Sequence, residues 1–197
     1  YGNRPIAMTF DGDQLDVREI SIKKDMHFVI VDLNAAKDTH EILRHLNRSY
    51  PFSETELHQN VQDYLGPINA DIVARTHKAL EAGDAETVGA LMIEAQTAFD
   101  KHLQPACPSQ LTAPVLHKVL AYDALKPYIY GGKGVGSQGD GTAQFIARDE
   151  ASQDKIVEII EGELEMSCLK LSLTPVRQVR KAVIPAAGFG AQLFPAT

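Results

Sequence analysis

The segment from residue 131 to residue 141 is rich in glycine and constrains the fold more than any other part of the sequence. It reads Gly-Gly-Lys-Gly-Val-Gly-Ser-Gln-Gly-Asp-Gly, so six of its eleven residues are glycine. Glycine loses more backbone entropy on folding than any other residue, so it gathers where φ is positive or where the backbone closely approaches a ligand or another backbone. Consecutive N–H groups in such a loop can point at one anion. The segment predicts either a phosphate-binding loop or a tight hairpin that holds no ligand.

Two common nucleotide-binding loops do not fit this segment. Residues 134–139 match G-x-G-x-x-G, but a dinucleotide-binding fold needs that motif between a strand and a helix. Here the motif is followed by residues 142–147, Thr-Ala-Gln-Phe-Ile-Ala, whose pattern indicates a strand. A Walker A loop needs glycine at position 127 and Ser or Thr after the lysine, whereas Pro127 and Gly134 stand there. The sequence therefore argues against both loops.

The order of apolar patterns along the chain predicts an α+β fold. Residues 15–22 and 27–33 alternate with a period of two, which predicts an antiparallel hairpin whose second strand is central. Several helical patterns follow, and residues after 128 then read as strand, glycine loop, strand, helix and strand. We therefore expect a mostly antiparallel sheet with helices packed on one face.

Capping residues mark the expected helix ends. Ser, Thr and Asp are favoured at the start of a helix, Pro is tolerated in its first turn, and Gly is favoured just after its end. Gly83 is the expected C-terminal cap of one helix. The expected starts are Asp38 or Thr39, Ser53 with Glu56 in a capping box, Gly66-Pro67, Asp84, and Ser109, whose helix ends before Pro127.

Composition excludes several classes of protein. With 197 residues, 44% of them hydrophobic and 23% charged, the chain has the composition of a soluble globular protein with one domain, or one domain and a piece of another. No apolar run approaches the roughly 20 residues of a membrane-spanning helix. A net charge of -7 argues against nucleic acid as a partner. We expect neither a membrane nor a nucleic-acid partner.

Cysteine and histidine usage bears on compartment and metal binding. Cys107 and Cys168 do not form a C-x-x-C pair, and no secretory segment opens the chain, so we expect a cytoplasmic protein. The seven histidines are scattered without an H-x-x-x-H pair. Because metal sites in proteins usually use such closely spaced ligands, we expect no metal site built from His and Cys.

The glycine segment resembles the third motif of the GHMP kinases, the family of galactokinase, homoserine kinase and mevalonate kinase. The resemblance rests on residues 132–142, in which a lysine precedes a glycine-rich turn that enters a strand. In that family the loop packs against the ATP-phosphate loop of the N-terminal domain and borders the phosphoryl acceptor. The resemblance extends from about Leu15 to Leu173 and implies that residues 1–174 form the ferredoxin-like C-terminal, substrate-side domain with extra helices.

The resemblance also implies the site residues. Ser137, Gln138 and Asp140 stand where the family more often has Ala or Gly, so they are candidates for contacts tuned to a particular substrate, although the charge of Asp140 would repel a phosphate. The implied phosphate- or substrate-binding loop comprises Lys133, Gly134, Gly136, Ser137, Gln138, Gly139, Asp140 and Gly141.

Residues 31–39 resemble the strand-to-helix passage near the family's substrate pocket. The residues that this resemblance offers for orienting substrate hydroxyls are Asp32, Lys37 and Asp38. The alternative is a solvated helix start at which Asp38 is only the cap.

Phosphoryl transfer needs a phosphate cradle, a metal ion and a group that orients or deprotonates the acceptor. In GHMP kinases the cradle, a P-x-x-x-G-L-G-S-S-like loop, and the acidic catalytic residue lie in the N-terminal half, and this sequence has no such loop. Residues 1–4, Tyr-Gly-Asn-Arg, look like the sequence just after the catalytic aspartate. We therefore assign no catalytic residue here, and expect ATP and Mg in a complete enzyme but none bound to this chain alone.

Residues 182–197 carry a second resemblance, to the opening of sugar-1-phosphate nucleotidyltransferases of the uridylyltransferase type. An apolar stretch runs into a glycine turn, and the residues implied for the nucleotide loop are Gly188, Gly190 and Gln192. That family usually has Thr-Arg after the second glycine, so Ala191-Gln192 lacks a cation expected to neutralise the triphosphate. We expect residues 175–197 to be a linker and an incomplete nucleotidyltransferase start, or otherwise a tail without its own function.

The two resemblances agree in their chemistry. A kinase that phosphorylates a sugar at its anomeric oxygen makes the sugar 1-phosphate that a nucleotidyltransferase consumes, so we expect a sugar or uronic acid as substrate and a missing N-terminal kinase half as partner. One alternative is a non-catalytic binding or regulatory module on the same scaffold. Another is a small homo-oligomer that buries the otherwise covered face against its own copy.

Overall fold

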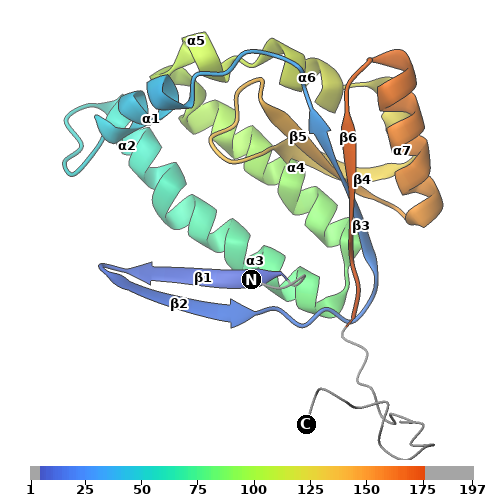
Figure 1. Cartoon of the computed structure of the whole chain (residues 1–197). Coiled ribbons are helices and arrows are strands. Elements are labelled where there is room, and N and C mark those ends of the chain that lie inside the picture. Colours follow the sequence, from blue (N-terminus) through green and yellow to red (C-terminus); the bar gives the residue numbers. More distant parts are fainter. Residues whose placement is uncertain (1–4, 176–197) are drawn as a thin grey trace, which may run out of the picture.

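The computed structural model describes residues 5–175 and consists of two antiparallel sheets and a set of helices (Figure 1). A kink at residues 64–68, where Gly66 has non-helical angles (φ -100°, ψ -107°), connects the second and third helices. The elements in chain order are β1 (Ile6–Asp11), β2 (Gln14–Glu19), β3 (Met26–Asp32), α1 (Thr39–Asn47), α2 (Glu56–Asp63), α3 (Asn69–Ala82), α4 (Ala85–His102), α5 (Pro108–Leu111), α6 (Pro114–Leu120), β4 (Ile129–Gly134), β5 (Thr142–Ala147), α7 (Glu150–Glu163) and β6 (Cys168–Leu173).

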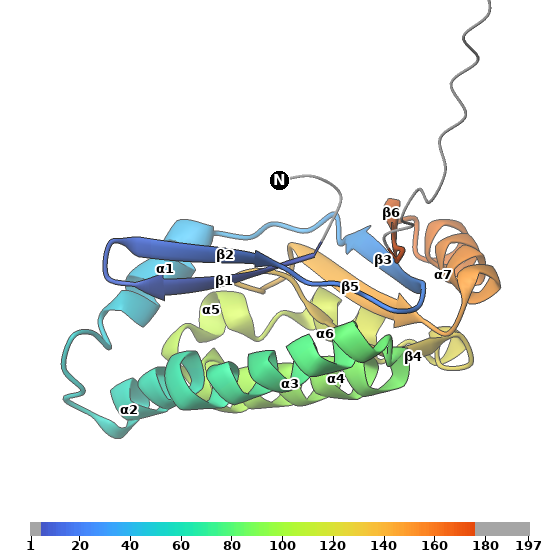
Figure 2. The same ribbon diagram turned by 90° about the horizontal axis from the view of Figure 1, so that it is seen from below.

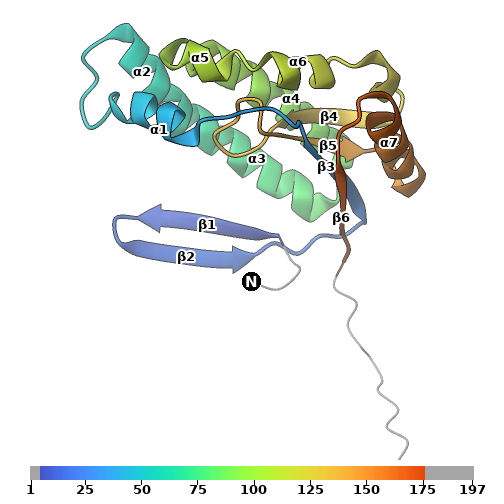
Figure 3. The same ribbon diagram turned by 45° about the horizontal axis from the view of Figure 1, so that its top comes forward.

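The four-stranded sheet has the strand order β4-β5-β3-β6, and all its neighbouring strands are antiparallel. The expectation that β3 is central is confirmed. The expectation that residues 15–22 pair with residues 27–33 is wrong, because β2 pairs with β1 in a separate two-stranded sheet. Gly12, with φ of 57°, and Asp13 connect those two strands, and a two-residue turn that starts with glycine favours a tight hairpin. Figure 3 shows this hairpin beside α3 and apart from the larger sheet.

The two faces of the four-stranded sheet pack against different helices. Successive strand residues point to opposite faces, so Val29 and Phe145 lie on one face while Met26 and Ile146 lie on the other. The Val29 face is covered by α6 and α7, and the Ile146 face meets α3 and α4, which lie side by side in Figure 2. The buried cluster on the Val29 face comprises Val29, Val31, Leu33, Ala113, Leu116, Val119, Leu125, Ala143, Phe145, Ala147, Ile156 and Ile160. The predicted α+β class with an antiparallel sheet is confirmed, but helices pack on both faces of the four-stranded sheet and not on one face as expected.

Three of the predicted helix ends, Asp38, Gly83 and Asp84, are confirmed. The Asp38 carboxylate accepts a hydrogen bond from the Glu41 N–H at 2.9 Å, the Asp84 carboxylate accepts one from the Thr87 N–H at 3.0 Å, and Gly83 ends α3 with φ of 70°. These caps were predictable because they depend only on residues within one helical turn.

Two predicted helix starts are wrong. Thr55 caps α2 instead of Ser53, because the Thr55 hydroxyl accepts the hydrogen bond from the backbone N–H of His58 at 3.1 Å. The single helix expected from Ser109 is two short helices, α5 and α6, separated at Ala113 with φ of 39°. Pro114 explains the break, since proline has no N–H to donate and is tolerated only in the first turn of a helix.

No helix in residues 5–175 is long and apolar enough to cross a membrane.

Candidate acceptor site at the glycine loop

A loop connects β4 to β5 as the sequence predicts, but it comprises residues 135–141, because residues 131–134, with Lys133 and Gly134, belong to β4. We call residues 135–141 the glycine loop. Three of its residues have positive φ angles, namely Gly136 (62°), Gln138 (59°) and Gly139 (71°). The loop closes with a hydrogen bond from the Val135 N–H to the Thr142 carbonyl at 3.0 Å, and the Gly141 carbonyl accepts one from the Leu33 N–H at 3.1 Å. The loop is thus a defined turn at one end of the central strands.

The first glycines of the segment are explained by close packing. A Cβ atom on Gly131 would lie 2.1 Å from the carbonyl oxygen of Gly89 in α4, and one on Gly132 would lie 2.5 Å from Cδ1 of Phe145. Real Cβ atoms do not come so close to other heavy atoms, so glycine is needed for α4 to rest on β4. At Gly136 a Cβ would meet nothing within 4 Å. Among the glycines of residues 131–141, only Gly136 has open space at this position.

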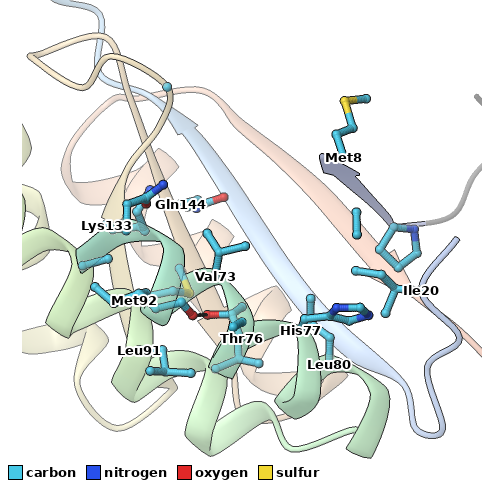
Figure 4. Close-up of a pocket in the computed structure, with 18 of the residues that line it drawn as sticks. Met8, Ile20, Val73, Thr76, His77, Leu80, Leu91, Met92, Lys133 and Gln144 are labelled. Atoms are coloured by element: carbon cyan, nitrogen blue, oxygen red, sulfur yellow. Dashed lines mark hydrogen bonds between the residues drawn. The ribbon is translucent and has the colours of Figure 1, made fainter. Parts of the chain in front are cut away.

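A cavity of about 900 Å³ lies between the Ile146 face of the sheet, the helices α3 and α4, and the β1–β2 hairpin. Its volume is that of a pocket for a small molecule. Most of its lining is apolar, with Val73 from α3 and Met92 from α4 as examples (Figure 4). Figure 4 places the polar side chains of Lys133 and Gln144 at the end away from Ile20. We call the end with Lys133 and Gln144 the polar end, although His77 also lines the cavity beside Ile20.

The glycine loop meets the polar end of this cavity. Gly136 and Gln138 belong to its lining together with Lys133. The Lys133 ammonium donates a hydrogen bond to the Gly134 carbonyl at 2.7 Å, and burial lowers the pKa of this ammonium. Gln138 is 2% exposed, and its Oε1 atom has no hydrogen-bond partner among the described residues. A buried oxygen without a partner is unusual in a folded protein.

Other predicted site residues have partners within the protein. The Asp140 carboxylate accepts a hydrogen bond from the Leu116 N–H at 2.8 Å and so caps the first turn of α6. The Asp32 carboxylate accepts one from the Asn34 N–H at 3.0 Å, and the Asp38 carboxylate caps α1. These bonds assign each carboxylate a structural role, whatever else it contacts.

Lys37 is brought to the glycine loop. A Cβ added to Gly141 would lie 2.8 Å from Cδ of Lys37, so the lysine stem packs on the backbone there. Burial lowers the pKa of the Lys37 ammonium. Ser137 is partly buried in the same loop. Of the three residues predicted between strand and helix, Lys37 is therefore the one that contacts the loop backbone through its side chain.

Gln96 of α4 accepts a hydrogen bond from Gly134, the last residue before the loop, and sequence reasoning did not identify this residue. It is 6% exposed, and its Oε1 accepts a hydrogen bond from the Gly134 N–H at 2.8 Å. Its Nε2 donates to Asp100 at 2.8 Å, and Asp100 lies 3.5 Å from His117 of α6. Burial raises the pKa of Asp100. The sequence signal that could have identified Gln96 is its polar side chain between Met92 and Phe99 on the apolar face of a helix.

Replacing Gln96 by leucine is expected to lower the free energy of unfolding by about 1–3 kcal/mol, because the buried Gly134 N–H loses its acceptor. Gln59→Leu is the matched control, since Gln59 also donates to a carboxylate four residues on, but at an exposed position. Urea unfolding of both variants checks the prediction. Equal effects of the two substitutions would contradict it.

Replacing Gly136 by valine is expected to lower the melting temperature. No atom stands in the way of the new side chain, so the cost is that of holding a β-branched residue at φ of 62°, about 1–3 kcal/mol. Gly136→Asn is the control, because asparagine adopts this conformation more readily. A valine variant that melts at the wild-type temperature would refute the prediction.

No protein-family model and no curated protein matches the chain. Solved structures do match it. The mevalonate kinase of L. major in complex with R-mevalonate has a TM-score of 0.62 and 16% identity over 88% of this chain and 50% of that one. The Lactococcus lactis galactokinase complexed with galactose has a TM-score of 0.56 and 13% identity over 89% of this chain and 52% of that one. A homoserine kinase from Cytophaga hutchinsonii has a TM-score of 0.53 and 15% identity over 84% of this chain and 46% of that one.

The fold is that of the GHMP kinases. At these levels of identity the likeness concerns the fold alone, and the chain spans about half the length of the kinases it matches. The expected fold of the C-terminal domain is confirmed. The nucleotidyltransferase-like residues Gly188, Gly190 and Gln192 and the opening residues 1–4 lie outside the described residues. Their assignment, and the division of the chain at residue 174, stay predictions.

Proposed function

We propose that this chain is the half of an ATP-dependent kinase that binds the phosphoryl acceptor. The complete kinase would phosphorylate a sugar or uronic acid to its 1-phosphate. The observation that carries the proposal is the glycine loop of a kinase fold meeting the polar end of a cavity of about 900 Å³. The cavity end offers an ammonium group, Lys133, and amide groups, Gln138 and Gln144. These are groups that bind hydroxyls, because ammonium groups donate hydrogen bonds and amides both donate and accept them.

In the proposed reaction these residues orient the acceptor. Phosphoryl transfer depends chiefly on positioning and on electrostatic stabilisation. The Lys133 ammonium would hold an acceptor hydroxyl near the loop backbone, and the apolar wall formed by residues such as Val73 and Met92 would exclude water. The amide of Gln144, which also lines this end of the cavity, would hydrogen-bond to a second hydroxyl.

We place ATP and Mg with an N-terminal kinase half, because the phosphate loop of the GHMP kinases lies in that half, and we derive no step from them here. Magnesium is usually held by one or two carboxylates together with substrate phosphates. The carboxylates of Asp140 and Asp32 at this end of the sheet each accept a hydrogen bond from a backbone N–H.

The choice of a sugar rests on the second resemblance, at residues 182–197. The similar structures include a galactokinase with galactose and a mevalonate kinase with R-mevalonate, so the fold is compatible with more than one acceptor class. If the kinase is fused to a nucleotidyltransferase, we expect its acceptor to be a sugar, because the nucleotidyltransferase consumes a sugar 1-phosphate.

The experiment is phosphorylation of a panel of sugars and uronic acids with ATP and Mg. It compares this chain with a version extended upstream by an ATP-binding kinase half. We expect product only from the extended version, and the panel then names the acceptor. Mevalonate and homoserine serve as non-sugar controls, and preference for either would overturn the sugar assignment. Absence of transfer by both versions would overturn the kinase proposal.

One observation favours a second candidate, a binding, regulatory or oligomerisation module. Leu169 and Leu171 lie on the Ile146 face of the sheet, in the edge strand β6, and are 63% and 43% exposed. Apolar side chains exposed on one sheet face often mark an interface. Sedimentation of this chain decides between a monomer and a self-associated form. Self-association that a Leu169→Lys, Leu171→Lys variant abolishes, together with absence of transfer by both versions, would support this candidate.

A further inference from the structure

Three metal-binding side chains from distant parts of the sequence meet beside the glycine loop. Glu41 and His45 lie on α1, and Cys107 immediately precedes α5. Each offers one ligand atom, and the carboxylate oxygen, imidazole nitrogen and thiol sulfur all lie within 4.8 Å of one another. Figure 1 shows α1 and α5 as neighbours.

Local sequence explains why these side chains converge. The Asp38 cap starts α1, and residues four apart then share one helix face, which places Glu41 and His45 one turn from each other. Ile42 anchors the helix in the helical core, where Cys107 is also fully buried, at 0% exposed. The thiol therefore has a fixed position opposite α1.

Neighbouring side chains orient the Glu41 carboxylate. The Ser109 hydroxyl donates to its Oε1 at 2.8 Å, and the Gln110 amide donates to its Oε2 at 2.9 Å. Each oxygen keeps a further lone pair for a cation. The Ser109 oxygen also lies 3.7 Å from the Cys107 sulfur. Hydrogen bonds that orient ligating groups in this way are typical of metal sites.

We propose that Glu41, His45 and Cys107 bind one divalent cation of the zinc class, with water in the fourth position. Imidazole and thiolate ligands favour zinc over magnesium and calcium. On binding, the Cys107 thiol loses its proton to solvent as the sulfur–metal bond forms. One carboxylate and one thiolate then balance the charge of the cation, so the half-buried site is electrically neutral.

The cation would fix α1 to α5 at the wall of the glycine loop. A Cβ on Gly139 would lie 3.2 Å from the Gln110 carbonyl oxygen and 3.6 Å from Cδ1 of Ile42, so both elements touch the loop. The backbone N–H of Asp38 also donates to Gln110 at 2.9 Å. This inference rests on the ligand geometry and does not depend on the kinase proposal.

The test uses Co²⁺ added to the metal-free full chain, because a cobalt–thiolate bond gives a charge-transfer absorption band. We expect one equivalent of Co²⁺ to produce this band and Zn²⁺ to remove it by competition. Cys107→Ser is expected to abolish the band, whereas the control Cys168→Ser retains it. No band in the full chain, or a band that persists in Cys107→Ser, would overturn the proposal.

Further variants cover the case in which Cys107→Ser does not fold. His45→Ala removes a partly buried ligand and is expected to weaken Co²⁺ binding by more than the roughly 10- to 100-fold that loss of an outer hydrogen bond costs. Ser109→Ala is expected to weaken binding within that range, and the exposed control His40→Ala is expected to leave it unchanged. Unaltered binding in His45→Ala would show adventitious binding elsewhere and refute the site.

Discussion

Replacing Gly131 by alanine is expected to destabilise the protein by about 3 kcal/mol or more. The added methyl group would lie 2.1 Å from the Gly89 carbonyl oxygen and 2.7 Å from its carbon, and both are backbone atoms that cannot rotate away. The helix α4 would have to move off β4, which would open the Ile146 face of the sheet. Because most domains have only about 5–15 kcal/mol of stability, a loss of this size is severe.

Guanidinium unfolding of Gly131→Ala measures the effect, with Gly162→Ala as the matched control. Gly162 lies in α7, where a Cβ would meet nothing within 4 Å, so alanine is expected to stabilise the helix by about 0.5–1 kcal/mol. The two substitutions add the same methyl group with opposite expected signs. A Gly131→Ala variant as stable as the wild type would contradict the close packing of α4 on β4.

Replacing Phe145 by alanine is expected to cost about 3–5 kcal/mol, the usual range for a buried phenylalanine. Phe145 is 0% exposed and lies in the cluster between the sheet, α6 and α7. A Cβ added to Gly132 in β4 would lie 2.5 Å from Cδ1 of Phe145. The Phe145 ring therefore occupies the space that a side chain at position 132 would otherwise fill. Removing the ring leaves a cavity between the sheet, α6 and α7.

Unfolding in urea checks this prediction against Phe52→Ala. Phe52 is 78% exposed, so its replacement is expected to change the unfolding free energy by no more than about 0.5 kcal/mol. Similar losses for the two variants would contradict the assigned core.

The parts of the fold that sequence reasoning predicted depend on local signals. The central position of β3 followed from a continuous apolar run, and the caps Asp38, Gly83 and Asp84 followed from residues within one turn. The pairing of β2 with β1 was missed, although the Gly12-Asp13 turn was a usable signal. Local sequence signals predicted the helices and strands, but they did not predict which strands pair with each other.

The candidate site depends on contacts between distant residues. The glycine segment indicated a loop, but the contact of Gly131 with Gly89 and the bond of Gln96 to Gly134 join residues from different elements. The structural hydrogen bond of Asp140 to Leu116 is of the same kind. No periodicity or motif records such contacts, because they arise only when α4 and α6 pack against the sheet.

The central claim is that the glycine loop and the polar end of the cavity serve the acceptor, and one measurement tests it most directly. In a version extended by an ATP-binding half, the Michaelis constants for acceptor and for ATP are determined for the wild type and for Lys133→Met, which keeps an apolar stem but loses the ammonium. We predict that the acceptor constant rises about 10-fold or more, the effect of losing a hydrogen bond to a charged group, while the ATP constant stays within about twofold. A higher constant for ATP with an unchanged constant for the acceptor, or no change in either, would contradict the claim.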